Sequence, residues 1–192
     1  MSTDSTPAAG TDEAPGGHTP EGGVLRGAED APHRLVVFED AQCPYCREFE
    51  QASAGLLEEE VAAGRLAVEH RMRAFLGPES VRAANALALA AEEGRFEELR
   101  TALFADQPQE GTGGFTADDL VAAGERVGLT GERYAAGVRE EVWSGWVLAA
   151  EDRFAQQDPD GTPMLYLDGE QVDPRLVYDR EALAGVLRPD AA

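Results

Sequence analysis

Lysine and isoleucine are absent from the 192-residue sequence, so arginine supplies all 16 of its strongly basic side chains. Without lysine, the protein cannot form a Schiff base through a lysine amine. The arginines face 37 acidic residues, which gives a formal net charge of −21. Proteins that bind nucleic acids need a basic stripe for the phosphate backbone, and none is visible here. We therefore expect no nucleic-acid partner.

Long apolar runs and export signals are also missing. No segment approaches the roughly 20 apolar residues of a membrane span. The N-terminus has no basic region followed by the apolar stretch of a signal peptide. As it stands, the sequence predicts a cytoplasmic chain with no membrane span, and a cell-envelope location is expected if the true start lies upstream.

The first part of the chain predicts a polar tail and then one βαβ unit. Residues 1–23 are rich in Ser, Thr, Pro, Gly and acidic side chains, a composition typical of a disordered tail. In the segment 24–75, a β-branched and aromatic run at 34–39 predicts a strand, and an apolar helical face begins at Pro44. Period-two alternation at 66–75 predicts a second, parallel strand.

The segment 76–158 predicts a helical block. Thr116 and Asp119 have the spacing of a capping box, which marks the start of a helix. The last helical pattern is long, and we expect one helix bent near Gly145. The expected helices cover 80–94, 95–106, 116–128 and 132–157.

The segment 159–192 returns to strand patterns. Asp168 and Gly169 form a strong turn signal inside 162–173, which predicts a hairpin. An amphipathic helix follows at 179–188. The order of these elements predicts one small α/β domain interrupted by a helical insertion.

The two cysteines of the chain lie three residues apart in "VVFEDAQCPYCREFE", between the first strand and its helix. This position places Cys43 at the first helical turn, where unpaired N–H groups and the helix dipole stabilise a thiolate. A thiolate is the nucleophilic form of cysteine, so Cys43 is predicted to attack. Pro44 suits the first helical position. Cys46 lies one turn further along and can close a ring with Cys43, which indicates redox chemistry.

Metal binding and a structural bridge are weaker interpretations of the same pair. A structural zinc site needs about four ligands, whereas His70 is the one histidine expected near the cysteines. We interpret His70 as a partly exposed structural residue and expect neither a metal nor a cofactor. A disulfide across so short a loop would add little stability, because it removes little entropy from the unfolded chain.

The motif "FEDAQCPYCREFE", followed after the helical block by "GTPMLYLDGEQV", resembles the DsbA-like branch of the thioredoxin superfamily over residues 24–190. The resemblance implies a thioredoxin fold with an inserted helical domain. It implies that Cys43 is the nucleophile and Cys46 the resolving thiol. Pro44 and Tyr45 would tune the redox potential.

The resemblance also implies a cis-proline at Pro163, preceded by Thr162, whose backbone would pair with an extended substrate peptide. One position departs from the family pattern. Relatives often carry a buried acid six residues before the first cysteine, and this chain has Val37 there. Strand alternation puts Glu39 on the same face, but the sequence does not place it beside Cys46.

The sequence therefore predicts a monomeric thiol–disulfide oxidoreductase that exchanges disulfides with protein or peptide substrates and is recycled by an unidentified redox partner. Two alternatives stay open at this stage. One is a glutaredoxin-like or reductase activity with a small thiol, and the other is a non-catalytic substrate-binding or chaperone-like module.

Overall fold

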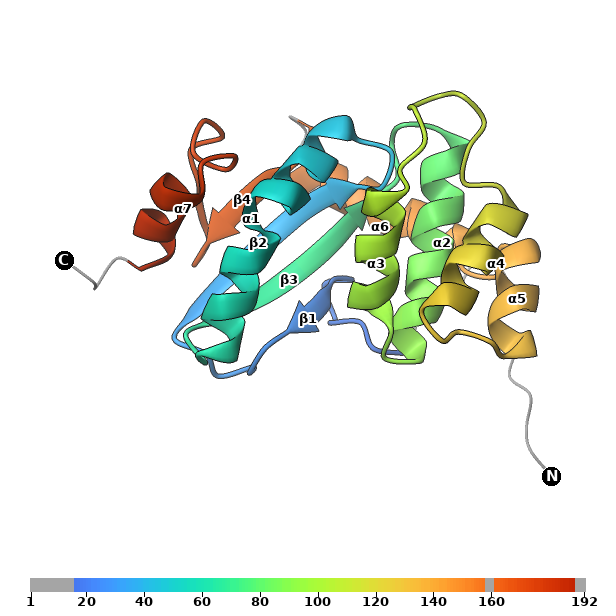
Figure 1. The fold of residues 1–192 in the computed structure, drawn as a ribbon, viewed down its shortest axis with the longest axis horizontal. Coiled ribbons are helices and arrows are strands. Elements are labelled where there is room, and N and C mark those ends of the chain that lie inside the picture. The colour runs from blue at the N-terminus through green and yellow to red at the C-terminus, as the bar shows by residue number, and fades with distance from the viewer. Residues whose placement is uncertain (1–15, 158–160, 189–192) are drawn as a thin grey trace.

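The computed structural model describes residues 16–157 and 161–188. Within these ranges it contains one mixed five-stranded sheet and seven helices (Figure 1). The strands are β1 (Val24–Arg26), β2 (His33–Asp40), β3 (Leu66–Arg73), β4 (Met164–Leu167) and β5 (Glu170–Gln171). The helices are α1 (Pro44–Ala62), α2 (Pro78–Glu92), α3 (Phe96–Ala105), α4 (Ala117–Arg126), α5 (Glu132–Arg139), α6 (Ser144–Gln157) and α7 (Arg180–Leu187).

The sheet has the strand order β1-β3-β2-β4-β5. The predicted βαβ unit is present: β2 and β3 pair in parallel and α1 connects them. The predicted hairpin is also present, because β4 and β5 are antiparallel across a turn in which Asp168 and Gly169 both have positive φ. Sequence periodicity therefore located the elements that bring the two cysteines to the end of β2.

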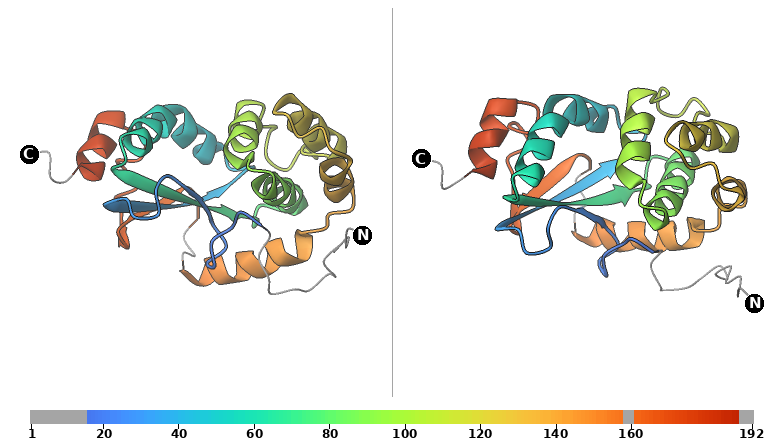
Figure 2. Two further views of the ribbon diagram at one scale, coloured as in Figure 1. Left: turned by 90° about the horizontal axis from the view of Figure 1, so that it is seen from below. Right: turned by 60° about the horizontal axis from the view of Figure 1, so that its bottom comes forward.

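Helices cover both faces of the sheet. Helices α1 and α7 lie on one face and α6 lies on the other, while α2 to α5 form a bundle beside the sheet (Figure 2). Alternation along β2 supplies both sides: Leu35 and Val37 pack toward α1 and α7, and Phe38 packs toward the insertion, edge-on against Phe154 of α6. All three β2 side chains are at most 2% exposed, as expected for core residues.

The capping box predicted at the start of α4 is formed, with Thr116 and Asp119 bonding each other's backbone N–H. The prediction of one helix over 132–157 is wrong. The chain breaks between α5 and α6, where Glu141 has φ of 50°. Buried Asn85 of α2 supports this break: its amide donates to the Gly137 carbonyl and accepts from the Trp143 N–H.

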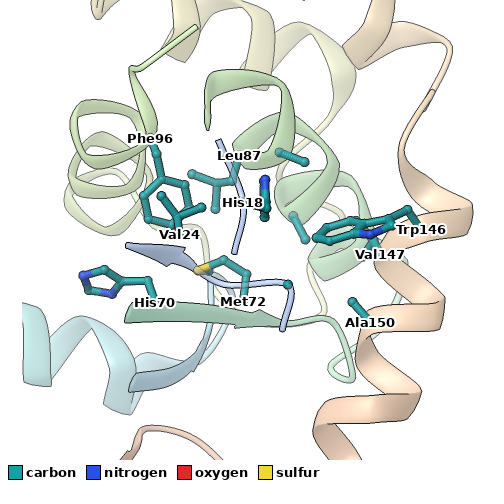
Figure 3. Close-up of a pocket in the computed structure, with 12 residues that line it drawn as sticks. His18, Val24, His70, Met72, Leu87, Phe96, Trp146, Val147 and Ala150 are labelled. Atoms are coloured by element: carbon teal, nitrogen blue, oxygen red, sulfur yellow. The ribbon is translucent and has the colours of Figure 1, made fainter. Parts of the chain in front are cut away.

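The N-terminal part of the chain differs from the predicted disordered tail. Residues 1–15 lie outside the described residues, but residues 16–23 pack against the domain. The His18 ring meets Trp146 edge-on at 4.8 Å, and the Thr19 hydroxyl donates to Glu69. Figure 3 shows His18 between α2 and α6. The pocket that His18 and its neighbours line has a volume of only about 10 Å³. The composition missed this order because the packing surface comes from residues far away in the sequence.

A short strand was also missed. β1 is only three residues long and pairs antiparallel with β3 at the edge of the sheet. Three residues are too few to show a periodicity. In the part of the chain that the structure describes, no helix combines the length and apolarity needed to cross a bilayer.

Candidate active site

The two cysteines lie where β2 ends and α1 begins. Cys43 is the N-cap residue of α1 with an extended backbone, and Pro44 occupies the first helical turn as predicted. The Cys43 carbonyl accepts hydrogen bonds from the N–H groups of Cys46 and Arg47. This geometry leaves the N–H groups of the first turn and the positive end of the helix dipole beside the Cys43 sulfur.

The environment of Cys43 favours its thiolate. A hydrogen bond from Cys46 is the main cause that lowers the pKa of Cys43 to about 6; burial opposes it, and Thr162 and the N–H groups of Tyr45 and Cys46 assist. Cys43 is only 5% exposed, so its thiol is more enclosed than was expected for a residue that attacks a substrate. About half of the Cys43 thiols are therefore ionised near pH 6.

The environment of Cys46 favours the protonated thiol. Its side chain has no exposed surface and packs with Phe104 of α3 and Leu76. Burial is the main cause that raises the pKa of Cys46 well above its ordinary value, and the charges of Cys43 and Glu39 add to it. Both cysteines are in the free state. The pair therefore combines one stabilised thiolate with one neutral neighbour that can donate a hydrogen bond.

The segment before β4 lies against Cys43. The Cys43 thiol donates to the Thr162 carbonyl at 3.3 Å, across 119 positions of sequence. The Thr162–Pro163 peptide bond is cis, which is the isomer that the resemblance implied. The structure therefore brings together Cys43, Cys46, Thr162 and Pro163, as the two quoted motifs predicted.

Glu39 belongs to a buried ionic cluster, which we define as Glu39, His70, Arg100, Glu97 and Glu50. Arg100 of α3 donates to both carboxylate oxygens of Glu39, at 2.6 and 2.8 Å. The two nitrogens of His70 lie 2.7 Å from Glu39 and 3.2 Å from Glu97. Burial alone would raise the pKa of Glu39, but the charges of Arg100 and His70 outweigh it and lower that pKa to about 2.

The cluster corrects the interpretation of His70. It also shows where an acid lies relative to Val37, the position at which the chain departs from the family pattern. His70 is 2% exposed rather than partly exposed. Val37 is a core residue with no exposed surface, and Glu39 lies two positions further along the same face of β2. The other four members of the cluster line a cavity of about 260 Å³ between α1 and α3. A charged residue therefore does lie within electrostatic reach of Cys46, but it is held as a carboxylate by Arg100.

Asp40, the next residue, has a different set of partners. Its carboxylate accepts hydrogen bonds from the Ser80 hydroxyl at 2.7 Å and from the Gln42 N–H at 2.9 Å. No arginine or histidine is bonded to it among the described residues, and burial raises the pKa of Asp40 to about 6. The clue to both acids in the sequence was that two charged residues directly follow the apolar run of β2.

Exposed aromatic side chains lie around the cysteines. Tyr45 is 59% exposed, and Phe75 is the residue before Leu76, which packs against the cysteines. Burial and the charges of both cysteines raise the pKa of Tyr178 to about 12, so Tyr178 also lies near them. Among the described residues, no group of three or more His, Cys, Asp or Glu side chains is arranged to hold a metal ion. The site therefore presents a reactive thiol, a buried second thiol and apolar surface around them.

Comparison with known proteins gives one family and two kinds of relative. The thioredoxin family model matches residues 19–182. Two curated relatives are Na⁺/H⁺ antiporters: NhaA 3 of Salinispora tropica is 28% identical over 152 residues, and NhaA 1 of Salinispora arenicola is 29% identical over 152 residues. These matches cover 79% of this chain, but the chain spans only 22% of either antiporter.

Solved structures share the fold over nearly the whole chain. BdbD from Bacillus subtilis has a TM-score of 0.79 and 21% identity, with 93% of this chain and 98% of that chain covered. MdbA from Actinomyces oris, described as a thiol-disulfide oxidoreductase, has a TM-score of 0.78 and 20% identity, with 92% of both chains covered. The fold predicted from the sequence, a thioredoxin fold with a helical insertion, is confirmed.

Proposed function

This chain belongs to the thioredoxin family, and from that premise we propose that it is a thiol–disulfide oxidoreductase that exchanges disulfides with protein substrates through Cys43 and Cys46. The observation that carries the proposal is the placement of the two thiols: Cys43 caps α1 and bonds the Thr162 carbonyl, and Cys46 is fully buried beside it. This placement moves their pKa values in opposite directions. A binding module has no use for a stabilised thiolate, whereas an exchange reaction needs one. This difference favours the oxidoreductase over the chaperone-like alternative.

The reaction starts from the oxidised protein, in which Cys43 and Cys46 share a disulfide. A substrate thiolate attacks the Cys43 sulfur, the bond between the cysteines breaks, and Cys46 leaves and takes up a proton. A second substrate thiolate then attacks the substrate sulfur of the mixed disulfide, and Cys43 leaves as a thiolate. Two substrate thiols become one disulfide, and the protein gains two electrons. A redox partner reoxidises the pair.

The low pKa of Cys43 favours oxidation of the substrate over its reduction. A stabilised thiolate stabilises the reduced protein, which makes the disulfide a stronger oxidant. We expect a reduction potential nearer to about −120 mV, the value of DsbA, than to about −270 mV, the value of thioredoxin. Equilibration with glutathione measures this potential, and a value at or below that of thioredoxin would favour a reductase.

The surface around the cysteines suits a polypeptide substrate. Tyr45, Phe75 and Tyr178 are each at least 40% exposed, and they can bury apolar side chains of an unfolded chain. In this proposal the Thr162 backbone, next to the Cys43 thiol, pairs with an extended substrate strand. In this proposal Pro44 and Tyr45 tune the redox potential, because they separate the two cysteines in the first helical turn.

An oxidase of this kind acts where disulfides persist, so we place it in the cell envelope rather than in the cytoplasm. The monomeric state and the division into 24–75, 76–158 and 159–192 stay predictions. We do not extend ion transport to this chain, because its match covers only 22% of the antiporters that carry that name.

Single cysteine substitutions test the proposal. At about pH 6, far below the ordinary cysteine pKa of about 8.5, iodoacetamide should label Cys43 and leave Cys46 unlabelled. Cys43→Ser should abolish exchange with a peptide disulfide. Cys46→Ser should accumulate a mixed disulfide, because no thiol remains to resolve it. Equal labelling of both cysteines, or a Cys46→Ser variant that never traps a partner, would contradict the assigned roles.

A further inference from the structure

The loop that carries Cys43 is attached to the helical insertion by two glutamine side chains. Gln42 lies in the loop itself, and Gln107 follows α3 in the segment that leads to α4. Neither glutamine was identified from the sequence, because an amide side chain is not a recognisable redox residue. Gln107 bonds the backbone of the loop, whereas the Gln42 side chain bonds residues outside it.

Gln107 bonds two carbonyls of the loop. Its Nε2 donates to the Ala41 carbonyl at 2.7 Å and to the Cys43 carbonyl at 3.0 Å. The Cys43 carbonyl is the N-cap acceptor of α1, which also receives the Cys46 N–H. The amide of Gln107 therefore holds two peptide planes, the one that precedes Gln42 and the one that follows Cys43.

Gln42 attaches the same loop to two further segments. Its Nε2 donates to the Leu76 carbonyl and to the Ser80 hydroxyl, both at 3.0 Å. Its Oε1 accepts from the Gly111 N–H at 3.2 Å. The side chain is 2% exposed. The segment between α3 and α4 is thus bonded to the loop at two points, by the side chain of Gln107 and by the backbone of Gly111.

We propose that Gln107 is a positioning residue for the exchange reaction, through which the helical insertion sets the reactivity of Cys43. Its two N–H bonds hold the Ala41 and Cys43 carbonyls so that the first-turn N–H groups of α1 stay directed at the Cys43 sulfur. Without these bonds the Ala41 carbonyl loses its Gln107 donor and the Cys43 carbonyl is held by the helical N–H groups alone, so the loop is held less firmly and the thiolate loses part of its stabilisation. The relevance to disulfide exchange rests on the proposed function, but the effect on the thiol does not.

The pH profile of Cys43 alkylation tests this inference in the reduced full-length protein. Gln107→Met removes both donors at similar size, and Gln107→Glu replaces the amide donor by a carboxylate. Both variants should raise the apparent pKa of Cys43 by about half a unit to one unit, which slows alkylation about three- to tenfold at about pH 5. The larger shift is expected for Gln107→Glu, because its charge opposes the thiolate.

Gln109 provides a matched control, since it lies exposed in the same segment. Gln109→Met and Gln109→Glu should reproduce the wild-type profile. If the Gln107 variants fold, as judged by circular dichroism, and also show the wild-type pH profile, the inference is overturned even when the protein exchanges disulfides.

If the Gln107 variants do not fold, Gln42→Met removes the other attachment and should raise the pKa of Cys43. An unchanged pH profile in Gln42→Met also overturns the inference. A wild-type protein without exchange activity whose Gln107 variants still shift the profile would overturn the proposed function alone.

Discussion

Glu39 and Asp40 are consecutive residues at the end of β2, both carboxylates have no exposed surface, and yet their pKa values move in opposite directions. Burial raises the pKa of either acid, but Arg100 and His70 outweigh it at Glu39 and lower that pKa to about 2. Among the described residues Asp40 has only neutral donors, Ser80 and backbone N–H groups, and burial raises its pKa to about 6. Neutral hydrogen bonds therefore offset only part of the burial cost that a full positive charge cancels.

The two acids also interact with different cysteines. Glu39 lies within electrostatic reach of Cys46, and its charge helps to raise the pKa of Cys46. Asp40 lies under the loop of Cys43, since its carbonyl accepts the Cys43 N–H at 3.0 Å. The ionic cluster thus adds to the asymmetry of the thiols on one side, and a network of neutral donors orders the loop on the other.

Removal of the positive charge should have the largest effect. Arg100→Met leaves Glu39 buried beside Glu50 without its guanidinium partner, and we expect a loss of about 3–5 kcal/mol in the free energy of unfolding. Urea denaturation at neutral pH measures it. Arg95→Met is the matched control, because Arg95 precedes the same helix and pairs with Glu98 at the surface, so that variant should lose only a small fraction of this amount.

The double variant Glu39→Gln/Arg100→Met separates charge from packing. It should recover much of the loss, because no uncompensated carboxylate remains at Glu39. If Arg100→Met is no more destabilising than Arg95→Met, the ionic cluster does not hold Glu39 as a carboxylate, and the contrast with Asp40 fails.

The pH dependence of stability should show the next largest effect. A raised pKa of about 6 in the folded state, against 3.8 unfolded, means that the folded protein holds the Asp40 proton over this interval while the unfolded chain releases it. The contribution of Asp40 to the free energy of unfolding therefore falls as pH rises from about 4 to about 6, by about 3 kcal/mol for a shift of about two units. Below this interval the contribution is fully retained.

Asp40→Asn isolates this effect. The asparagine oxygen can still accept from Ser80 and Gln42, but it does not ionise, so the stability of the variant relative to wild type should rise over the same interval. Urea denaturation of the oxidised protein at several pH values measures the difference, since no cysteine thiol titrates in that form. A difference that stays constant with pH would show that Asp40 does not keep its proton.

The sequence was sufficient for the fold and for the residues that the structure brings together around Cys43. Periodicity located β2, α1 and β3, the turn signal located the hairpin, and the motifs identified Cys43, Cys46, Thr162 and Pro163. These features depend on local patterns of a few residues or on a family motif. They are therefore readable from one chain without its contacts.

The supporting partners could not be read in this way. Arg100 is 61 positions from Glu39, and Gln107 is 64 positions from Cys43, so neither pairing follows from local spacing. The break before α6 depends on Asn85, which comes from another helix. An arginine on an amphipathic helix, or a glutamine just after one, looks like a surface residue until the packing of the insertion shows its partners.

The smallest effect should be that of Glu39 on the Cys46 thiol, because burial and Cys43 contribute more to its raised pKa. In a Cys43→Ser background, which removes the neighbouring thiolate, Glu39→Gln should lower the pKa of Cys46 by less than about one unit. The substitution removes the negative charge of Glu39 and leaves the positive charge of Arg100 less compensated. Both changes stabilise the Cys46 thiolate and so lower its pKa. The rate of Cys46 alkylation between about pH 8 and pH 11 measures the shift. Asp40→Asn in the same background should change it less, because Asp40 lies under the loop of Cys43. If Asp40→Asn shifts the Cys46 profile more than Glu39→Gln does, each acid has been assigned to the wrong cysteine.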